Sequence, residues 1–199
     1  MPTPRLILAS SSVYRRQLMD RLGLDYEVDK PEVDEEQLKS QIDDPTQLAE
    51  ALAELKAKTV FQRHPDAIVI GSDQVGHFKG QILGKPGTTE KNQQQLQKMT
   101  GQTHDLITSV CVLAPNFKTI FTDTTRLTMR NLTTHQIAKY VEADNPLDCA
   151  GGYKLELGGI ALFQSIESKD FTAIQGLPLI ELIDVLKGFG LNSKVLGVL

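Results

Sequence analysis

The sequence predicts an α/β fold in which helices flank a mixed, twisted sheet, with two lobes around an active-site cleft. Two observations indicate this class. Short apolar runs typical of buried strands alternate along the chain with amphipathic segments that carry apolar residues at helical spacing. Two long strand-like runs, at 104–114 and 119–129, then follow each other across a turn at Pro115-Asn116. No repeat or linker interrupts this order, so we expect one domain over residues 1–199.

The first part of the chain is expected to contain three strands and two helices. In order, we expect a strand at 5–9, a helix from about 12 to 23, a short strand at 26–29, an acidic loop at 32–36, a helix from 44 and a buried strand at 67–71. Leu18 and Leu22 lie on one face of the first helix, which stops at Gly23. Asp44 caps the second helix, with Pro45 at its first helical position.

The remaining elements are predicted from turn and capping signals. In order, we expect a hairpin through 79–80 into 82–86, a helix at 89–99, the two long strands, a helix after 133, a strand at 160–163 and a final helix from 178. Thr133 and Gln136 form a capping-box pattern. The paired glycines Gly151 and Gly152 permit a tight turn or a close approach to a ligand.

Composition limits the classes of partner and the cellular compartment that we expect for this protein. The chain has 21 Lys and Arg against 25 Asp and Glu, a net charge of −4 and no basic block, so we do not expect nucleic acid as the main partner. Cys111 and Cys149 are too few for a disulfide framework, which favours a reducing cytoplasm. The short apolar run at 6–9 does not suffice for a signal peptide, and no apolar run is long enough to span a membrane. We therefore expect a cytosolic protein without a membrane partner.

An anion site is predicted where the first strand ends. Ser10, Ser12 and Arg15 would bring hydroxyls, the free N–H groups of a helix start and a guanidinium to one place, which suits phosphate. No glycine-rich phosphate loop is found in the sequence, so such a site would depend on Ser and Arg. Serines before a helix are equally typical of a simple N-cap, and this segment alone leaves both interpretations open.

Charged residues recur near the ends of the predicted strands. Asp73 follows the second buried strand and Lys85 follows the hairpin, at the sheet edge where α/β proteins bind ligands. Together with Arg15 and Lys56 as cations and Glu35 as a second carboxylate, they fit a metal-dependent reaction on a polyphosphate. Glu35 and Asp73 would hold Mg²⁺ or Mn²⁺, and one carboxylate would activate the attacking water. Taken singly, Lys56 is also typical of a solvated helix residue and Glu35 of a loop acid.

Other kinds of site are disfavoured. The four histidines lack metal-ligand spacing, which argues against an all-histidine metal centre. The chain has no G-x-S-x-G sequence, and no histidine stands in a context that suggests a base for a nucleophilic serine.

Six short motifs occur in order along the chain: Ser-x-Ser-x-x-Arg at Ser10, Ser12 and Arg15, Val-Asp-Glu at 33–35, Gly-x-Asp at 71–73, Gly-Lys-Pro at 84–86, Ala-Gly-x-[Phe/Tyr] at 150–153 and Gly-Leu-Pro at 176–178. This ordered set resembles the motifs of the Maf-like nucleotide pyrophosphatases. Each motif is weak alone, but the ordered set covers nearly the whole chain.

This resemblance implies a Maf/ITPase-like fold and cleavage of a nucleoside triphosphate into the monophosphate and pyrophosphate. It further implies dependence on a divalent metal, a homodimer and a role in cleaning the nucleotide pool. By the same resemblance, Asp73 is the proton acceptor, and Arg15, Glu35, Lys56 and Lys85 line the triphosphate site.

Three positions separate substrate branches in this family, and they hold Tyr14, Gln74 and Glu156 here. Gln and Glu at the last two are typical of the branch that hydrolyses 7-methyl-GTP. Methylation at N7 makes guanine cationic, so Tyr14 could stack on the ring, and Glu156 could accept from N1–H and the exocyclic amine. Tyr14 could instead pack on the core. The alternatives to a 7-methyl-GTP pyrophosphatase are a dTTP/UTP pyrophosphatase of the same family and a non-catalytic nucleotide-sensing protein linked to cell division.

Overall fold

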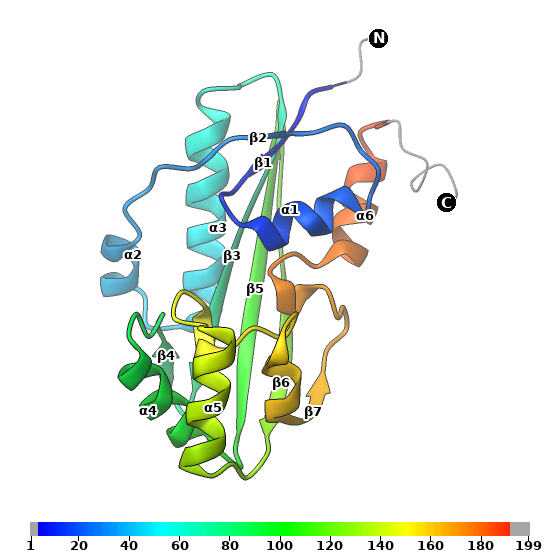
Figure 1. The fold of residues 1–199 in the computed structure, drawn as a ribbon. Helices are drawn as coiled ribbons and strands as arrows, with labels where there is room; N and C mark the ends of the chain where they lie inside the picture. Colours follow the sequence, from blue (N-terminus) through cyan, green and yellow to red (C-terminus); the bar gives the residue numbers. More distant parts are fainter. Residues whose placement is uncertain (1–3, 192–199) are drawn as a thin grey trace. The chain divides into compact units, whose positions relative to one another are not determined.

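The computed structural model describes residues 4–191 and contains a mixed seven-stranded sheet flanked by helices (Figure 1). The strands are β1 (Leu6–Ala9), β2 (Glu27–Val28), β3 (Ile68–Phe78), β4 (Gln81–Leu83), β5 (Thr103–Ala114), β6 (Phe117–Met129) and β7 (Phe163–Glu167). The helices are α1 (Val13–Asp20), α2 (Glu36–Gln41), α3 (Pro45–Phe61), α4 (Thr89–Met99), α5 (Thr134–Asp144) and α6 (Leu179–Lys187), with 3₁₀ turns η1 (Ala150–Gly152), η2 (Gly158–Leu162) and η3 (Ala173–Gln175). The predicted α/β class is confirmed.

The strands follow the order β2-β1-β3-β5-β6-β7, and β4 pairs with β3 off this path. β1 is parallel to both β2 and β3, whereas β4 is antiparallel to β3 and β7 is antiparallel to β6. The β3–β4 hairpin turns at Lys79 and Gly80, which both have positive φ, as a two-residue type I′ turn requires.

The chain divides into two compact units. Among the described residues, the first unit contains 4–73, 108–123 and 170–191, and the second contains 74–107 and 124–169. β3, β5 and β6 each contribute residues to both units. The single domain expected over 1–199 includes 1–3 and 192–199, which lie outside the described residues, and it stays a prediction.

In the first unit, strand alternation divides the core into two layers. Leu6 and Leu8 of β1 join Ile68 and Ile70 of β3 in a cluster with α1 and α6. The intervening residues of the same strands pack with α3 in a second cluster, so α3 covers one face and α1 and α6 cover the other (Figure 1). Continuous buried runs such as those in β1 and the first half of β3 are typical of parallel strands covered on both faces.

In the second unit, α4 packs against α5. The predicted capping box is present at the start of α5, where the Thr133 hydroxyl accepts from the Gln136 N–H and the Gln136 side chain accepts from the Thr133 N–H. Tyr153, His104 and Phe163 form a buried ring cluster, with the centroids of Tyr153 and Phe163 4.8 Å apart.

Three sequence-based predictions require correction. β3 runs on to Phe78, so Asp73 lies inside a strand and not after its end. The strand continues because it pairs with β4 beyond the point where β1 stops at Ala9, which is opposite Gly71. The predicted strand at 160–163 is wrong: these residues belong largely to η2, and β7 begins at Phe163, where pairing to Met129 of β6 starts. The third correction concerns α2, a helix that begins at Glu36, where only an acidic loop over 32–36 was expected.

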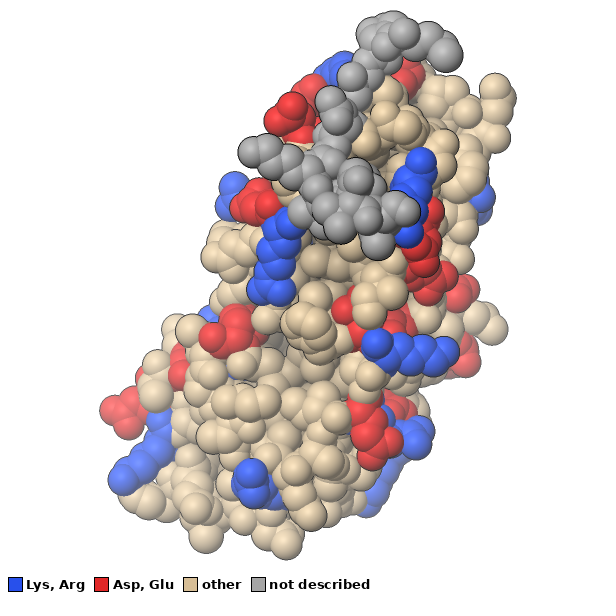
Figure 2. Space-filling view, turned by 90° about the vertical axis from the view of Figure 1, so that its right-hand side faces the viewer, with Lys and Arg blue, Asp and Glu red and all other residues tan. Residues whose placement is uncertain are grey.

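No helix within residues 4–191 is long and apolar enough to cross a membrane. On the face shown in Figure 2, acidic and basic side chains of the described residues are interspersed.

Candidate active site

The β1–α1 connection uses both predicted serines in its own structure. The buried Ser10 hydroxyl accepts from the Ser12 N–H at 3.0 Å, and the Ser12 hydroxyl caps α1 by accepting from the Arg15 N–H at 3.4 Å. The N-cap interpretation of Ser12 is therefore confirmed. Because each hydroxyl acts as an acceptor in these contacts, its own proton can still be donated to an anion.

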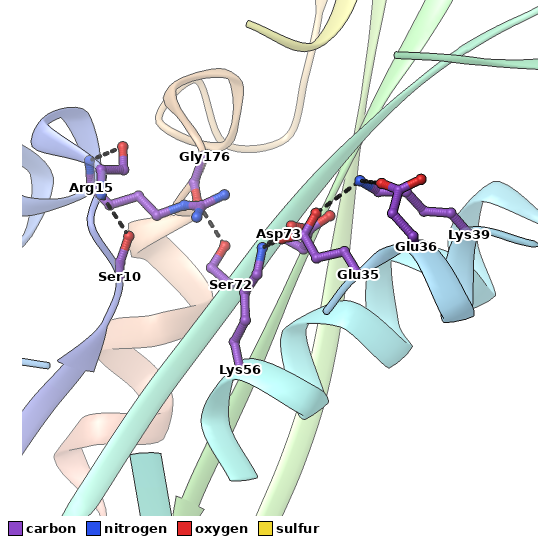
Figure 3. A network of polar contacts seen from close by, with 10 residues as sticks. Ser10, Arg15, Glu35, Glu36, Lys39, Lys56, Ser72, Asp73 and Gly176 are labelled. Carbon is purple, nitrogen blue, oxygen red and sulfur yellow. Dashed lines mark hydrogen bonds and ion pairs between the residues drawn. The ribbon is translucent and has the colours of Figure 1, made fainter. Parts of the chain in front are cut away.

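Arg15 extends from the first turn of α1 toward the carbonyl of Gly176. Its Nε donates to that oxygen at 2.9 Å, and the Ser72 hydroxyl of β3 donates to the same oxygen at 2.8 Å (Figure 3). Burial lowers the pKa of Arg15, whereas the charges of Asp73 and Glu35 raise it. An arginine stays protonated in such surroundings, so the site holds a fixed positive charge that interacts with the charges of both carboxylates.

Gly176 belongs to the Gly-Leu-Pro motif, but no local pattern predicted that its carbonyl would accept hydrogen bonds from both Arg15 and Ser72. Its φ of +99° is a backbone conformation that favours glycine, and a Cβ there would stand 3.0 Å from Arg15 Nε. The glycine therefore serves both the turn and the close approach of the guanidinium.

Lys56 of α3 lies between the two predicted carboxylates (Figure 3). Its Nζ is 2.7 Å from Glu35 Oε1 and also forms an ion pair with Asp73 Oδ1. The Lys56 and Asp73 side chains are 12% and 11% exposed, so this pair is shielded from bulk water. The structure thus brings together Lys56, Glu35 and Asp73 as the sequence predicted, and the solvated-helix interpretation of Lys56 is wrong.

Glu35 is also held by a residue that the sequence analysis missed. Lys39 of α2 contacts Glu35 Oε2 and Glu36 Oε1, each at 3.0 Å. Burial would raise the pKa of Glu35, but the hydrogen bonds and charges of Lys56 and Lys39 outweigh it and lower the pKa to about 2. Glu35 is therefore ionised at neutral pH. The spacing of Lys39 four residues after Glu35 would have suggested this contact if α2 had been predicted.

The donor set is compatible with a divalent cation. Glu35 and Asp73 direct oxygens at one ammonium group, so the protein already places a positive charge between them. Residues 4–191 contain no group of three or more His, Cys, Asp and Glu side chains placed to hold a metal. Mg²⁺ is commonly bound by one or two carboxylates together with water and substrate phosphates, so two carboxylates suffice for a site completed by a nucleotide.

The remaining predicted residues are placed as follows. Tyr14 is half-buried in the first turn of α1. Gln74, Lys85 and Glu156 belong to the second unit. Gln74 lies in β3, Lys85 follows β4, and Glu156 is exposed in the turn between η1 and η2.

A comparison with known protein families identifies the family of this chain. The sequence profile of the family described as Maf-like protein matches residues 5–189. This chain belongs to the Maf-like protein family. The family expected from the six motifs is therefore confirmed.

Curated relatives match this Maf-like protein over nearly its whole length. It is 51% identical over 191 residues to a protein of Bdellovibrio bacteriovorus named 7-methyl-GTP pyrophosphatase, which covers 96% of this chain and 100% of the relative. Proteins with the same name from Xanthomonas axonopodis pv. citri and Syntrophotalea carbinolica are 49% and 44% identical, covering 94% and 96% of this chain and 97% of each relative.

Proposed function

We propose that this Maf-like protein is a nucleoside triphosphate pyrophosphatase that hydrolyses 7-methyl-GTP to 7-methyl-GMP and pyrophosphate and so removes this nucleotide from the pool. The observation that carries the proposal is the convergence of Glu35 and Asp73 on Lys56, because paired carboxylates beside fixed cations suit hydrolysis of a phosphoanhydride. The name of the three relatives supports the choice of nucleotide.

In the proposed mechanism, Asp73 acts as the general base. Its carboxylate accepts a proton from the water molecule that attacks the α-phosphorus, and the bond between this phosphorus and the oxygen of the leaving pyrophosphate breaks. Arg15, Lys56 and Lys85 offset the charge that develops on the pyrophosphate, and the Ser10 and Ser12 hydroxyls donate to phosphate oxygens. Glu35 and Asp73 would hold Mg²⁺ or Mn²⁺, which neutralises triphosphate charge when bound.

Base selection is assigned to Tyr14, Gln74 and Glu156. The Glu156 carboxylate can accept hydrogen bonds from N1–H and the exocyclic amine of guanine at once, whereas thymine and uracil offer no such donor pair. The Tyr14 ring offers an aromatic face to the cationic N7-methylated base. Gln74 is the third residue assigned to substrate binding, on the resemblance to the 7-methyl-GTP branch.

We also propose that the protein acts in the cytoplasm as a homodimer, without nucleic acid or a membrane as partner. The net charge of −4 and the free Cys111 and Cys149 thiols support this setting, and the homodimer rests on the family resemblance alone.

The test is pyrophosphate release with Mg²⁺ or Mn²⁺ from 7-methyl-GTP, GTP, dTTP, UTP and CTP at one concentration. A preference for 7-methyl-GTP is expected. A preference for dTTP or UTP would move the protein to the other branch of the family, and no release from any nucleotide would favour a nucleotide-sensing protein.

A further inference from the structure

Glu156 lies in a turn whose backbone hydrogen bonds converge on the carbonyl of Lys154. The Lys154 carbonyl accepts hydrogen bonds from the Leu157 N–H at 3.2 Å and from the Gly159 N–H at 3.0 Å. A Cβ at Gly159 would stand 2.3 Å from the same carbonyl oxygen, so only glycine permits this approach. The position of Glu156 therefore depends on where Lys154 is held.

Lys154 is held to α5 through its backbone and its side chain. Its N–H donates to the Tyr140 hydroxyl at 2.9 Å. Its Nζ donates to the Asn145 carbonyl at 3.3 Å and lies 3.4 Å from Asp148 Oδ1, with the side chain 14% exposed. Lys154 thus joins the end of α5 to the turn that carries Glu156.

The Tyr140 side chain is held in place by its burial in α5. It is buried on the inner face of α5, and burial raises the pKa of its hydroxyl, which stays protonated at neutral pH. The neighbouring Tyr153 is anchored independently, since its hydroxyl lies 2.8 Å from Nε2 of the buried His104. Burial lowers the pKa of His104 to about 4, so this second anchor stays uncharged at neutral pH.

We propose that Tyr140 is a positioning residue for base selection, because its hydroxyl holds Lys154 and thereby the turn from which Glu156 reads the nucleobase. The inference rests on the proposed function, in which Glu156 accepts hydrogen bonds from guanine. Tyr140 touches neither the substrate nor the reacting phosphate in this scheme and acts only through Lys154.

The anchoring is tested without substrate by amide hydrogen exchange. Tyr140→Phe keeps the ring and removes the oxygen that accepts from Lys154 N–H. Exchange at Lys154, Leu157 and Gly159 should rise about threefold to tenfold, the factor expected for one lost hydrogen bond. Tyr26→Phe is the matched control, because the Tyr26 hydroxyl is bonded to Asp20 and Arg16 in the first unit and its loss should leave these amides unchanged.

Base selection is tested by the ratio of kcat/KM for 7-methyl-GTP to that for dTTP, measured on the same sample. This ratio does not depend on the folded fraction, so partial unfolding of the variant cannot imitate the effect. Tyr140→Phe should lower the ratio about threefold to tenfold, mainly through KM for 7-methyl-GTP. In a Glu156→Gln background the same change should have no further effect, because the path through Glu156 is already removed.

Four results would overturn the inference. Unchanged exchange at residues 154–159 would show that Tyr140 does not hold the turn, whatever the turnover. Raised exchange with an unchanged ratio, or an equal loss of ratio in the Glu156→Gln background, would separate Tyr140 from base selection. Absence of pyrophosphate release from every nucleotide in the wild-type protein would instead refute the proposed function, and the assignment of Tyr140 to base selection with it.

Discussion

Replacing Lys56 by Met should reveal how strongly the two carboxylates depend on the cation between them. The change keeps most of the side-chain volume of Lys56 but leaves the buried Asp73 carboxylate and Glu35 without their shared ammonium. Removing one partner from a buried ion pair costs about 3–5 kcal/mol. Glu35 keeps Lys39 and some contact with water, so we expect a loss near the lower end, about 3 kcal/mol at pH 7.

The lowered pKa of Glu35 predicts how the destabilisation by Lys56→Met changes with pH. The pKa of Glu35 is lowered from 4.5 to about 2 in the folded protein, so its contribution to stability is present above pH 4.5 and is lost as pH falls toward 2. Protonation of Glu35 removes the charge that Lys56 neutralises. The difference in stability between the wild-type protein and Lys56→Met should therefore shrink as pH falls through this range.

The assay is urea unfolding of both proteins, with a chelator present, at pH 7 and at the lowest pH at which both still fold. Lys58→Met is the matched control: Lys58 lies on the same helix and its ion pair with Glu54 is exposed at the lysine end, so its loss should cost less than about 1 kcal/mol. A loss below about 1 kcal/mol for Lys56→Met at pH 7, or an equal loss at both pH values, would refute the reasoning.

Three further predictions follow from the same site. Asp73→Asn should reduce pyrophosphate release by a factor of about 10²–10⁴ while nucleotide binding measured by calorimetry persists, and unchanged turnover would remove Asp73 from the mechanism. A chelator should abolish turnover and Mg²⁺ or Mn²⁺ should restore it, whereas full activity in the chelator would exclude the proposed role of Glu35 and Asp73 as ligands. Gly71→Ala should destabilise the protein by about 1–3 kcal/mol or more in thermal unfolding, because its Cβ would stand 2.5 Å from the Ala53 carbonyl, while Gly188→Ala, whose Cβ has ordinary contacts, should be nearly neutral.

Most of the elements could be predicted because local signals determine them. The stripe of apolar residues on α1, the Asp44 cap of α3 and the capping box at Thr133 each depend on neighbours in sequence. The strand expected at 160–163 failed for the opposite reason. Its apolar residues suit a strand, but Gly159 bonds to Lys154 and holds the segment in a 3₁₀ turn until pairing with β6 begins.

The sequence indicated which charged residues are candidates for the site, but it did not predict which of them contact one another. Lys56 and Glu35 are 21 positions apart, and only the packing of α3 beside the acidic loop makes them a pair. Lys39 escaped notice because α2 is short and has no side-chain cap, so its start carries little local signal. The contact of Gly176 with both Arg15 and Ser72 spans more than a hundred residues for each side chain, and no periodic pattern encodes it.

The Gly-x-Asp motif nevertheless has a physical reason that joins the fold to the site. Gly71 faces α3 so closely that an added Cβ would stand 2.6 Å from the Ala57 N atom, which brings the helix against β3 at that point. Residues two apart in a strand share a face, so Asp73 also faces α3, and Lys56, the residue before Ala57, reaches it. The intervening Ser72 turns to the opposite face and bonds to Gly176 beside Arg15. One glycine therefore sets the helix distance at which the carboxylate meets its lysine, and a larger residue there would disturb stability and the site together.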